Sequence, residues 1–300
     1  MTILTMDATP TSFARLAGFG ALSAAGPDAR AFLHAQLTND VAGLPADRAR
    51  IAGWCSAKGR LLASLLVIPH GEGFLLQLAR DLAAPVAKRL GMFVLRSKVK
   101  LRDASEDWLQ YGLWGAGAAA QLAALRLEAA PDPLAVAATN DALSVRIDDA
   151  RFLVIARTVP AFTGREAPEQ EWLLQEIRAG RPLVVQATQD QFVPQMTNLE
   201  MVGGVDFRKG CYPGQEIVAR SQYRGQVKRR MLRAAVDSAP AAGQPLFAQN
   251  GQASGTVVIG APSPDGGYEL LAVAQLESGT LHLGAANGPL LRPLPLPYAA

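Results

Sequence analysis

The sequence is poor in residues that ligate metals. Its 300 residues include two cysteines, Cys55 and Cys211, and three histidines, His34, His70 and His282. These residues are scattered and show none of the short spacings of zinc or iron–sulfur ligand sets. We therefore predict no metal site held by this chain alone. A cluster that passes through transiently, or that a partner helps to hold, remains compatible with this scarcity.

Long hydrophobic runs are also missing. No stretch approaches the roughly 20 apolar residues of a membrane helix, and the most apolar one, residues 61–69, has the length of a strand. Residues 1–7 lack the basic-then-apolar order of a signal peptide. We expect a cytoplasmic protein without a membrane partner. In that reducing compartment the two cysteines are not expected to form a disulfide.

Charged residues are few, at 18%, against 49% apolar residues. This composition excludes wholesale disorder, and the length predicts two or three structural units. Hydrophobic periodicity predicts helices over 28–39, 81–96, 116–127 and 166–179. Strands are expected over 50–56, 60–68, 74–79, 98–102, 108–114, 143–147 and 151–156.

The pattern changes after residue 225. Short strand-like segments at 229–236, 245–248, 255–259, 269–274 and 281–284 are separated by Gly, Pro and Asn-Gly. Such spacing is typical of a small barrel. We predict an α+β protein, with a body over residues 1–225 made of two interleaved subdomains and a C-terminal β-barrel over 226–300.

Positive charge is concentrated in one segment. Residues 208–233 contain eight basic residues and a single acidic one, Glu216, although the whole chain carries only +3. A local positive field attracts anions, such as a folate tail, a phosphate or RNA. The alternative for the distal part, residues 228–233, is an arginine-rich strand whose outward side chains are simply solvated.

Cys211 lies within that basic segment, in the run Lys-Gly-Cys-Tyr-Pro-Gly-Gln-Glu over residues 209–216. Pro213 fits the first position of a helix, which would place Cys211 just before the helix N-terminus. Free backbone amides and the neighbouring Arg208 and Lys209 would lower the pKa of the thiol. Gly210 would permit a tight turn or the close approach of a ligand.

A buried, unreactive thiol is the alternative for Cys211, because free cysteines often behave as small hydrophobic residues. The flanking cations and the expected helix terminus favour the reactive interpretation. Cys55 has no such surroundings. It lies in an apolar strand, and we interpret it as a core residue.

Residues 209–216, followed by Val-Ala-Arg at 218–220 and Tyr-Arg-Gly at 223–225, resemble the signature of the YgfZ family. That family is folate-binding and tRNA-modifying, and it is related to the glycine cleavage T protein. Residues 26–40 resemble its first helix, and residues 55–60 the hairpin that follows. Pro194-Gln195 and Asn198-Leu199 resemble the lead-in to the cysteine loop. The resemblance spans about residues 15–235.

The resemblance implies a T-protein-like folate-binding body with a C-terminal barrel, and tetrahydrofolate or a derivative bound near the central opening, close to the cysteine loop. It also implies a role in assembling or repairing iron–sulfur clusters, including that of a tRNA methylthiotransferase. Cys211 would be the nucleophile or a transient cluster ligand, and Lys209 would lower its pKa or hold an anion. We expect cofactor contacts from Arg208, Gly210, Tyr212, Gln215, Glu216 and Arg220.

The chain departs from the T protein at two places. The T protein's asparagine-rich catalytic segment would fall near residues 74–81, which contain no asparagine. Its pterin-recognition stretch would fall near residues 151–154, where Arg-Phe-Leu-Val stands instead. These departures argue against glycine cleavage.

Two other functions stay open at this point. One is a tetrahydrofolate-dependent aminomethyl- or methyltransferase. The other is a non-catalytic RNA-binding module that uses the basic segment, and it predicts a steep dependence of tRNA affinity on salt. Few aromatic residues accompany these arginines, which weakens the RNA-binding hypothesis.

Overall fold

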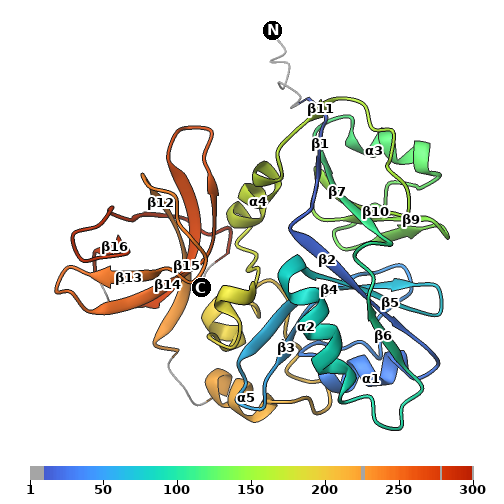
Figure 1. The fold of residues 1–300 in the computed structure, drawn as a ribbon, viewed down its shortest axis with the longest axis horizontal. Coiled ribbons are helices and arrows are strands. Elements are labelled where there is room, and N and C mark those ends of the chain that lie inside the picture. Colours follow the sequence, from blue (N-terminus) through green and yellow to red (C-terminus); the bar gives the residue numbers. More distant parts are fainter. Residues whose placement is uncertain (1–9, 224–226, 278, 299–300) are drawn as a thin grey trace, which may run out of the picture.

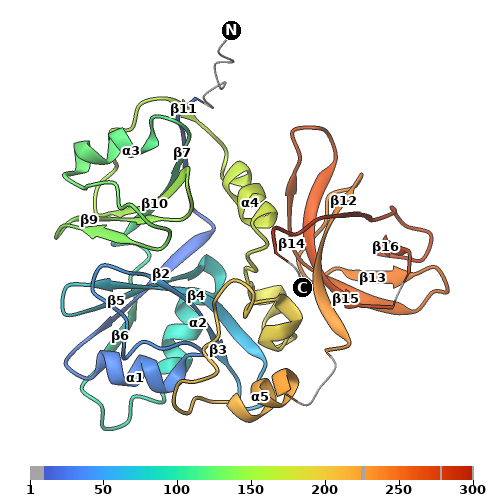
Figure 2. The same cartoon turned by 180° about the vertical axis from the view of Figure 1, so that it is seen from behind.

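The computed structural model describes residues 10–223, 227–277 and 279–298, and these residues form three antiparallel sheets with helices packed on them (Figure 1). One pair, β1 with β11, runs parallel. In both views, the third sheet stands beside the other two, with α4 (Glu169–Arg178) between them (Figure 2).

The first sheet has six strands, in the order β11-β1-β7-β10-β9-β8. The strands are β1 (Ser12–Arg15), β7 (Leu109–Trp114), β8 (Val136–Ala138), β9 (Ala142–Arg146), β10 (Arg151–Ala156) and β11 (Arg165–Glu166). The helix α3 (Ala118–Gln121), continued by a 3₁₀ turn over Leu122–Leu125, packs on one face of this sheet.

The second sheet has five strands, in the order β3-β4-β5-β2-β6. The strands are β2 (Phe19–Ala25), β3 (Arg50–Cys55), β4 (Leu61–His70), β5 (Gly73–Ala79) and β6 (Lys100–Asp103). The helices α1 (Ala29–Gln36) and α2 (Arg80–Gly91) bury their apolar sides against it, in a core that includes Leu33, Leu76 and Val86. The opposite face packs on the first sheet through a core that includes Ile68, Leu75 and Ile155.

The chain passes from the first sheet to the second and back again, because β1 belongs to the first, β2 to β6 to the second, and β7 to β11 to the first. The strands of the two sheets are therefore interleaved along the chain. The boundary expected near residue 225 lies at residues 224–226, outside the described part of the chain.

The third sheet confirms the predicted all-β region. Its order is β16-β13-β14-β15-β12-β17, with β12 (Arg229–Val236), β13 (Pro245–Ala248), β14 (Ala253–Pro262), β15 (Tyr268–Gln275), β16 (Leu281–Leu283) and β17 (Arg292–Leu294). The sheet is curled into a half-barrel. Leu270 and Ala272 of β15 point into its own core, and the alternate residues Leu271 and Val273 pack against α4.

Charged residues join the third sheet to the body. Glu269 of β15 is almost fully buried and accepts hydrogen bonds from Arg178 of α4 and Arg233 of β12. Arg230 forms an ion pair with the buried carboxylate of Glu200. These partners explain two of the arginines in the basic segment as structural residues, whose charge is already balanced inside the protein.

The structure shortens several expected helices. The helix expected over 28–39 is α1, which ends at Gln36, and the one over 116–127 narrows to α3 and its 3₁₀ turn. The helix expected over 81–96 is α2, which ends at Gly91.

None of the helices in the described residues is long and apolar enough to cross a membrane.

Candidate functional site

Cys211 is exposed, and its thiol is free. The helix after it, α5, spans Gln215–Tyr223 and so begins two residues later than the start expected at Pro213. Gly214, in the left-handed region with a φ of 77°, separates Pro213 from the helix. The expected helix start is therefore wrong by two residues, and Cys211 lies four positions before the first helical residue instead of two.

The loop rests on the turn of the β3–β4 hairpin. Gly59, in that turn, has a φ of 68°. A Cβ atom on Gly214 would overlap the carbonyl oxygen of Ser56 and the backbone of Gly59. The two backbones meet so closely that only glycine fits at position 214, and this contact fixes the end of the loop that leads into α5.

Lys209 anchors the other end of the loop. Its side chain is buried, and its Nζ donates hydrogen bonds to the carbonyl oxygens of His34, at 2.5 Å, and Leu37, at 2.9 Å. Both carbonyls lie at the C-terminal end of α1, where the helix dipole favours a cation. The ammonium also lies 4.8 Å from the centroid of the Tyr212 ring.

The surroundings of Lys209 lower its pKa from the ordinary value to about 8, and burial is the main cause. The nearby Asp40 and Asp206 act in the opposite direction and partly restore the charged form. Lys209 is thus a cation held in place by carbonyl groups.

Tyr212 and Cys55 lie together beneath the loop. Tyr212 is 7% exposed and Cys55 is 2% exposed. Burial raises the pKa of the Tyr212 hydroxyl and the pKa of the Cys55 thiol far above their ordinary values. The interpretation of Cys55 as a core residue is confirmed.

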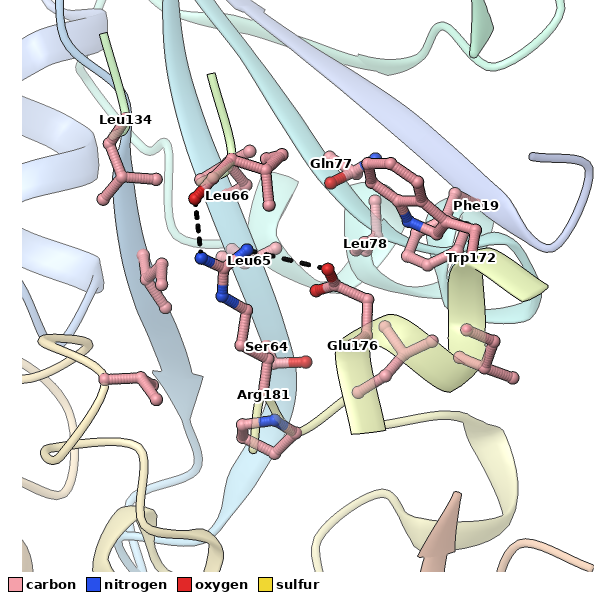
Figure 3. Close-up of a pocket in the computed structure, with 16 residues that line it drawn as sticks. Phe19, Ser64, Leu65, Leu66, Gln77, Leu78, Leu134, Trp172, Glu176 and Arg181 are labelled. Atoms are coloured by element: carbon pink, nitrogen blue, oxygen red, sulfur yellow. Dashed lines mark hydrogen bonds and ion pairs between the residues drawn. The ribbon is translucent and has the colours of Figure 1, made fainter. Parts of the chain in front are cut away.

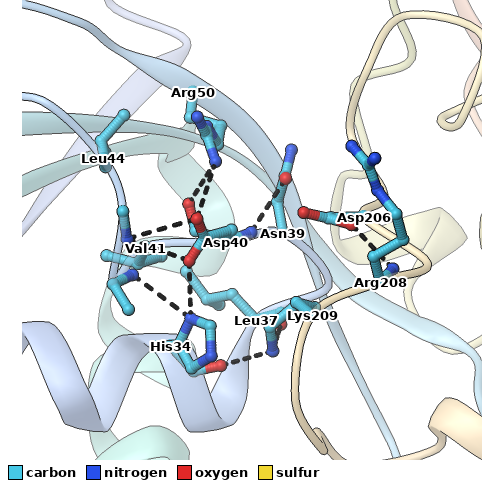
Figure 4. Close-up of polar contacts among 12 residues, drawn as sticks. His34, Leu37, Asn39, Asp40, Val41, Leu44, Arg50, Asp206, Arg208 and Lys209 are labelled. Carbon is cyan, nitrogen blue, oxygen red and sulfur yellow. Dashed lines mark hydrogen bonds and ion pairs between the residues drawn. The ribbon is translucent and has the colours of Figure 1, made fainter.

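Asp40 lies at the centre of a polar cluster beside the loop (Figure 4). Its carboxylate lies 3.0 Å from His34 Nδ1 and 3.5 Å from Arg50, and it accepts a hydrogen bond from the Gly43 amide. Burial alone would raise the pKa of Asp40, but the Gly43 amide, Arg50 and His34 outweigh it and hold the pKa below its ordinary value. Asp40 is therefore a fixed negative charge near Lys209.

Buried hydrogen bonds join this cluster to the segment that precedes Lys209. The Thr38 hydroxyl donates to the Gly204 carbonyl at 2.6 Å, and the Asn39 amide donates to the Gly203 carbonyl at 2.6 Å. The Asp206 amide donates to the Thr38 carbonyl at 3.0 Å. The end of α1 and the cysteine loop consequently form one rigid unit, although they are far apart in sequence.

The remaining predicted residues lie around this unit without converging on a single point. Arg208 is exposed, and its backbone amide donates to the carboxylate of Asp206. Gln215 is half-buried at the start of α5. Glu216 and Arg220 form an exposed ion pair at 3.0 Å on α5.

Gly210 is exposed, and its φ lies outside the left-handed region. A Cβ atom there would meet only His34 Nε2, at 3.6 Å. The space above Gly210 is therefore open, and the histidine ring borders it.

A cavity lies where the second sheet, the first sheet and α4 meet (Figure 3). Its apolar walls include Phe19, Leu65, Leu66, Leu78 and Trp172, and its polar side chains include Gln77, Glu176 and Arg181. None of residues 208–216 lines it. The residue that lies nearest to the cysteine loop along the chain is Val202.

The cavity combines mostly apolar walls, two of them aromatic, with a few hydrogen-bonding side chains. Glu176 accepts a hydrogen bond from Arg151 at 2.7 Å and lies 3.6 Å from Arg181. Gln77 donates to Gln110, whose own Nε2 is buried without a partner.

Among the described residues, no three histidine, cysteine or carboxylate side chains lie close enough together to hold a metal ion.

Comparison with known proteins identifies the fold and then the family. Aminomethyltransferase T of the glycine cleavage system from Bartonella henselae is similar in structure, with a TM-score of 0.71 over 95% of this chain and 85% of that one, at 16% identity. The fold is therefore of the aminomethyltransferase T class, and the predicted T-protein-like α+β architecture is confirmed.

The curated relatives share much more sequence. The tRNA-modifying protein YgfZ of Edwardsiella ictaluri is 33% identical over 90% of this chain and 86% of its own length. That of Klebsiella pneumoniae is 32% identical over 97% and 94%. This chain belongs to the YgfZ family of tRNA-modifying proteins, as the resemblance predicted. No protein-family model matches it.

Sequence reasoning missed the contribution of α1 to the site. Neither Asp40 nor His34 was among the predicted site residues, yet both lie beside the loop. The only signal was their presence in residues 26–40, the segment that carries part of the family resemblance. Their contact depends on α1 ending at Gln36, which periodicity did not predict.

Replacing Lys209 by methionine should lower the free energy of unfolding by about 1–3 kcal/mol at neutral pH, because two carbonyls lose their donor. The pKa of Lys209 is lower in the folded protein than in the unfolded chain, so the unfolded chain binds the extra proton between about pH 8 and pH 10.5. The titration of Lys209 therefore makes wild-type stability rise with pH across this window, and the variant lacks that contribution.

Urea unfolding of both proteins across the window measures this difference, which should widen as the pH rises. Lys58→Met, on the exposed tip of the β3–β4 hairpin, is the matched control and should unfold like the wild type. Equal stability and parallel pH profiles for Lys209→Met and the wild type would show that the anchor contributes nothing.

Proposed function

We propose that this protein is a folate-binding accessory factor that supports tRNA modification by assembling or repairing iron–sulfur clusters, with Cys211 as its reactive group. The observation that carries the proposal is that Cys211 is exposed in a loop whose residues Lys209 and Tyr212 are buried. A cysteine kept for packing would be buried, as Cys55 is. Here the loop is anchored so that the sulfur faces outward.

Transient ligation is the role that suits this thiol. A thiolate is a strong ligand for iron, but a stable cluster needs several ligands. Among the described residues no other group is placed to complete such a set. Cys211 would therefore hold a cluster only together with a client protein, and the cluster would be cargo rather than a resident cofactor.

Tetrahydrofolate would occupy the cavity between the two sheets of the body. Trp172 would lie against the pterin, and Gln77 and Glu176 would contact its polar edge. When bound, the folate supplies a one-carbon carrier. The fold of the aminomethyltransferase T class supports this assignment, and the unpartnered donor of Gln110 behind Gln77 is an additional group that a ligand could engage.

The RNA-binding alternative has less support. Arg230 and Arg233 of the basic segment are bound to the buried carboxylates of Glu200 and Glu269. Arg220 pairs with Glu216. These arginines have carboxylate partners within the protein and are less available to a phosphate backbone.

Cys211→Ser should abolish the cellular function. The serine hydroxyl is nearly isosteric but does not ionise at neutral pH and binds iron poorly. In a bacterial strain that lacks its own YgfZ-family protein, methylthio-modified tRNA nucleosides, measured by mass spectrometry, should fall at least tenfold relative to rescue by the wild type. Cys55→Ala is the matched control and should still rescue. Full rescue by Cys211→Ser would contradict the proposal.

Folate binding should quench the fluorescence of Trp172, since a pterin would lie against its indole. Titration of the purified protein with tetrahydrofolate should give a saturable decrease, and Trp172→Phe should lose most of that decrease. Trp108→Phe, which alters a tryptophan that does not line the cavity, should keep it. An identical decrease in wild type and Trp172→Phe would place the folate elsewhere.

A further inference from the structure

All charged side chains in most of α2 and in the segment that follows it are basic. Residues 82–102 contain no acidic residue and six basic ones, namely Lys88, Arg89, Arg96, Lys98, Lys100 and Arg102. Arg102 pairs with Asp107. The other five have no ion-pair partner among the described residues, and all five are exposed.

Large apolar side chains are exposed in the middle of this segment. Leu95 is 89% exposed, Met92 65% and Phe93 45%. Three large apolar side chains exposed within four consecutive residues are unusual on a protein surface, and clustered exposed apolar side chains often mark an interaction site. We call these three residues and the five unpaired cations the α2 patch.

The patch is preformed. After Gly91 the chain leaves the helix and continues through turns closed by backbone hydrogen bonds, among them Phe93 to Leu90 at 3.0 Å and Ser97 to Val94 at 2.8 Å. Leu95 has a φ of 45°, a conformation that is unfavourable for a leucine. Had the helix continued to Arg96 as periodicity predicted, Leu95 would not project in this way.

Two contacts fix the patch to the body. The Phe93 ring packs edge-on against Trp54, with centroids 6.4 Å apart. The Lys98 amide donates to the carboxylate of Asp28 at 2.7 Å. The exposed side chains of Met92 and Leu95 are therefore carried by a segment that is held to the body at Phe93 and Lys98.

The patch and the cysteine loop share a support. Trp54, which contacts Phe93, pairs with Leu37 through an isolated β-bridge. The carbonyl of Leu37 in turn accepts the hydrogen bond from Lys209. A partner that docks on the patch is thus held beside the end of α1, from which the Cys211 loop is anchored.

We propose that the α2 patch is the docking surface for a protein partner whose contact face is apolar at its centre and acidic at its rim. Apolar contacts at the centre of an interface supply binding energy, and complementary rim charges steer association. The identification of this partner as the iron–sulfur client rests on the function proposed above, whereas the docking surface itself does not.

Two other occupants fit the patch less well. RNA binding uses cations together with aromatic or arginine stacking platforms, and the most exposed apolar side chains here are the aliphatic Met92 and Leu95. A second copy of this chain, docked symmetrically through the same patch, would place its cations against their counterparts.

The functional test uses two double variants. Met92→Glu with Leu95→Glu makes the apolar centre of the patch acidic. Arg96→Glu with Lys98→Glu reverses the sign of two charges at the rim of the patch. Each should reduce methylthio-modified tRNA at least fivefold in the rescue assay, with unchanged thermal unfolding. Val159→Glu, at a residue that is 72% exposed and lies outside the patch, is the control and should rescue fully.

The outcomes separate the two proposals. If both double variants rescue while Cys211→Ser fails, the docking surface is wrong and the proposed function stands. If Cys211→Ser rescues, the proposed function is wrong, and the docking surface is decided by a second measurement that does not depend on function.

That measurement is photo-crosslinking in cells, with benzoylphenylalanine in place of Leu95 or, as control, of Val159. The expected result is an adduct at position 95 that resists ribonuclease and disappears in the Arg96→Glu, Lys98→Glu variant. Mass spectrometry of the adduct should identify a protein whose crosslinked peptide is flanked by acidic residues. An adduct that ribonuclease removes, an adduct with a second copy of this chain, or no adduct above the control would each overturn the proposal.

Discussion

The arrangement of the site depends on the burial of a single ammonium group. Lys209 is bound by two carbonyls at the end of α1 and by the face of Tyr212. Withdrawing a lysine from water is unfavourable, and the depressed pKa of Lys209 reflects that penalty. The carbonyls and the nearby carboxylates offset it. These contacts fix the first residue of the loop, and Cys211, which lies between the buried residues Lys209 and Tyr212, faces solvent.

The second sheet supports every feature that the proposals use. Its β3–β4 turn carries the end of the cysteine loop, at Gly59 and Gly214. One face bears α1 and α2, and hence both the lysine anchor and the α2 patch. Residues from both of its faces, Leu66 and Leu78 among them, line the cavity next to Trp172.

The features that could be predicted from the sequence are those that depend on residues close together along the chain. The eight-residue cysteine motif indicated the family and the exposed thiol, and alternation revealed most strands of the second and third sheets. Sequence analysis missed the features that depend on contacts between residues far apart along the chain. The partners of Lys209 lie 175 and 172 residues away, so its anchoring role left no local signal. Apolar spacing extended α2 to Arg96, because periodicity does not distinguish a buried helical face from the exposed side chains of Met92 and Leu95.

The reactivity of the two thiols tests the account most directly. With a chromogenic disulfide reagent, one thiol per native chain should react rapidly, Cys211→Ser should remove that reaction, and Cys55 should react only after unfolding. Lys209→Met should change the rate at Cys211, since the loop would lose its anchor. A native protein in which Cys211 is protected, or in which both thiols react alike, would contradict the claim that the buried lysine holds this sulfur at the surface.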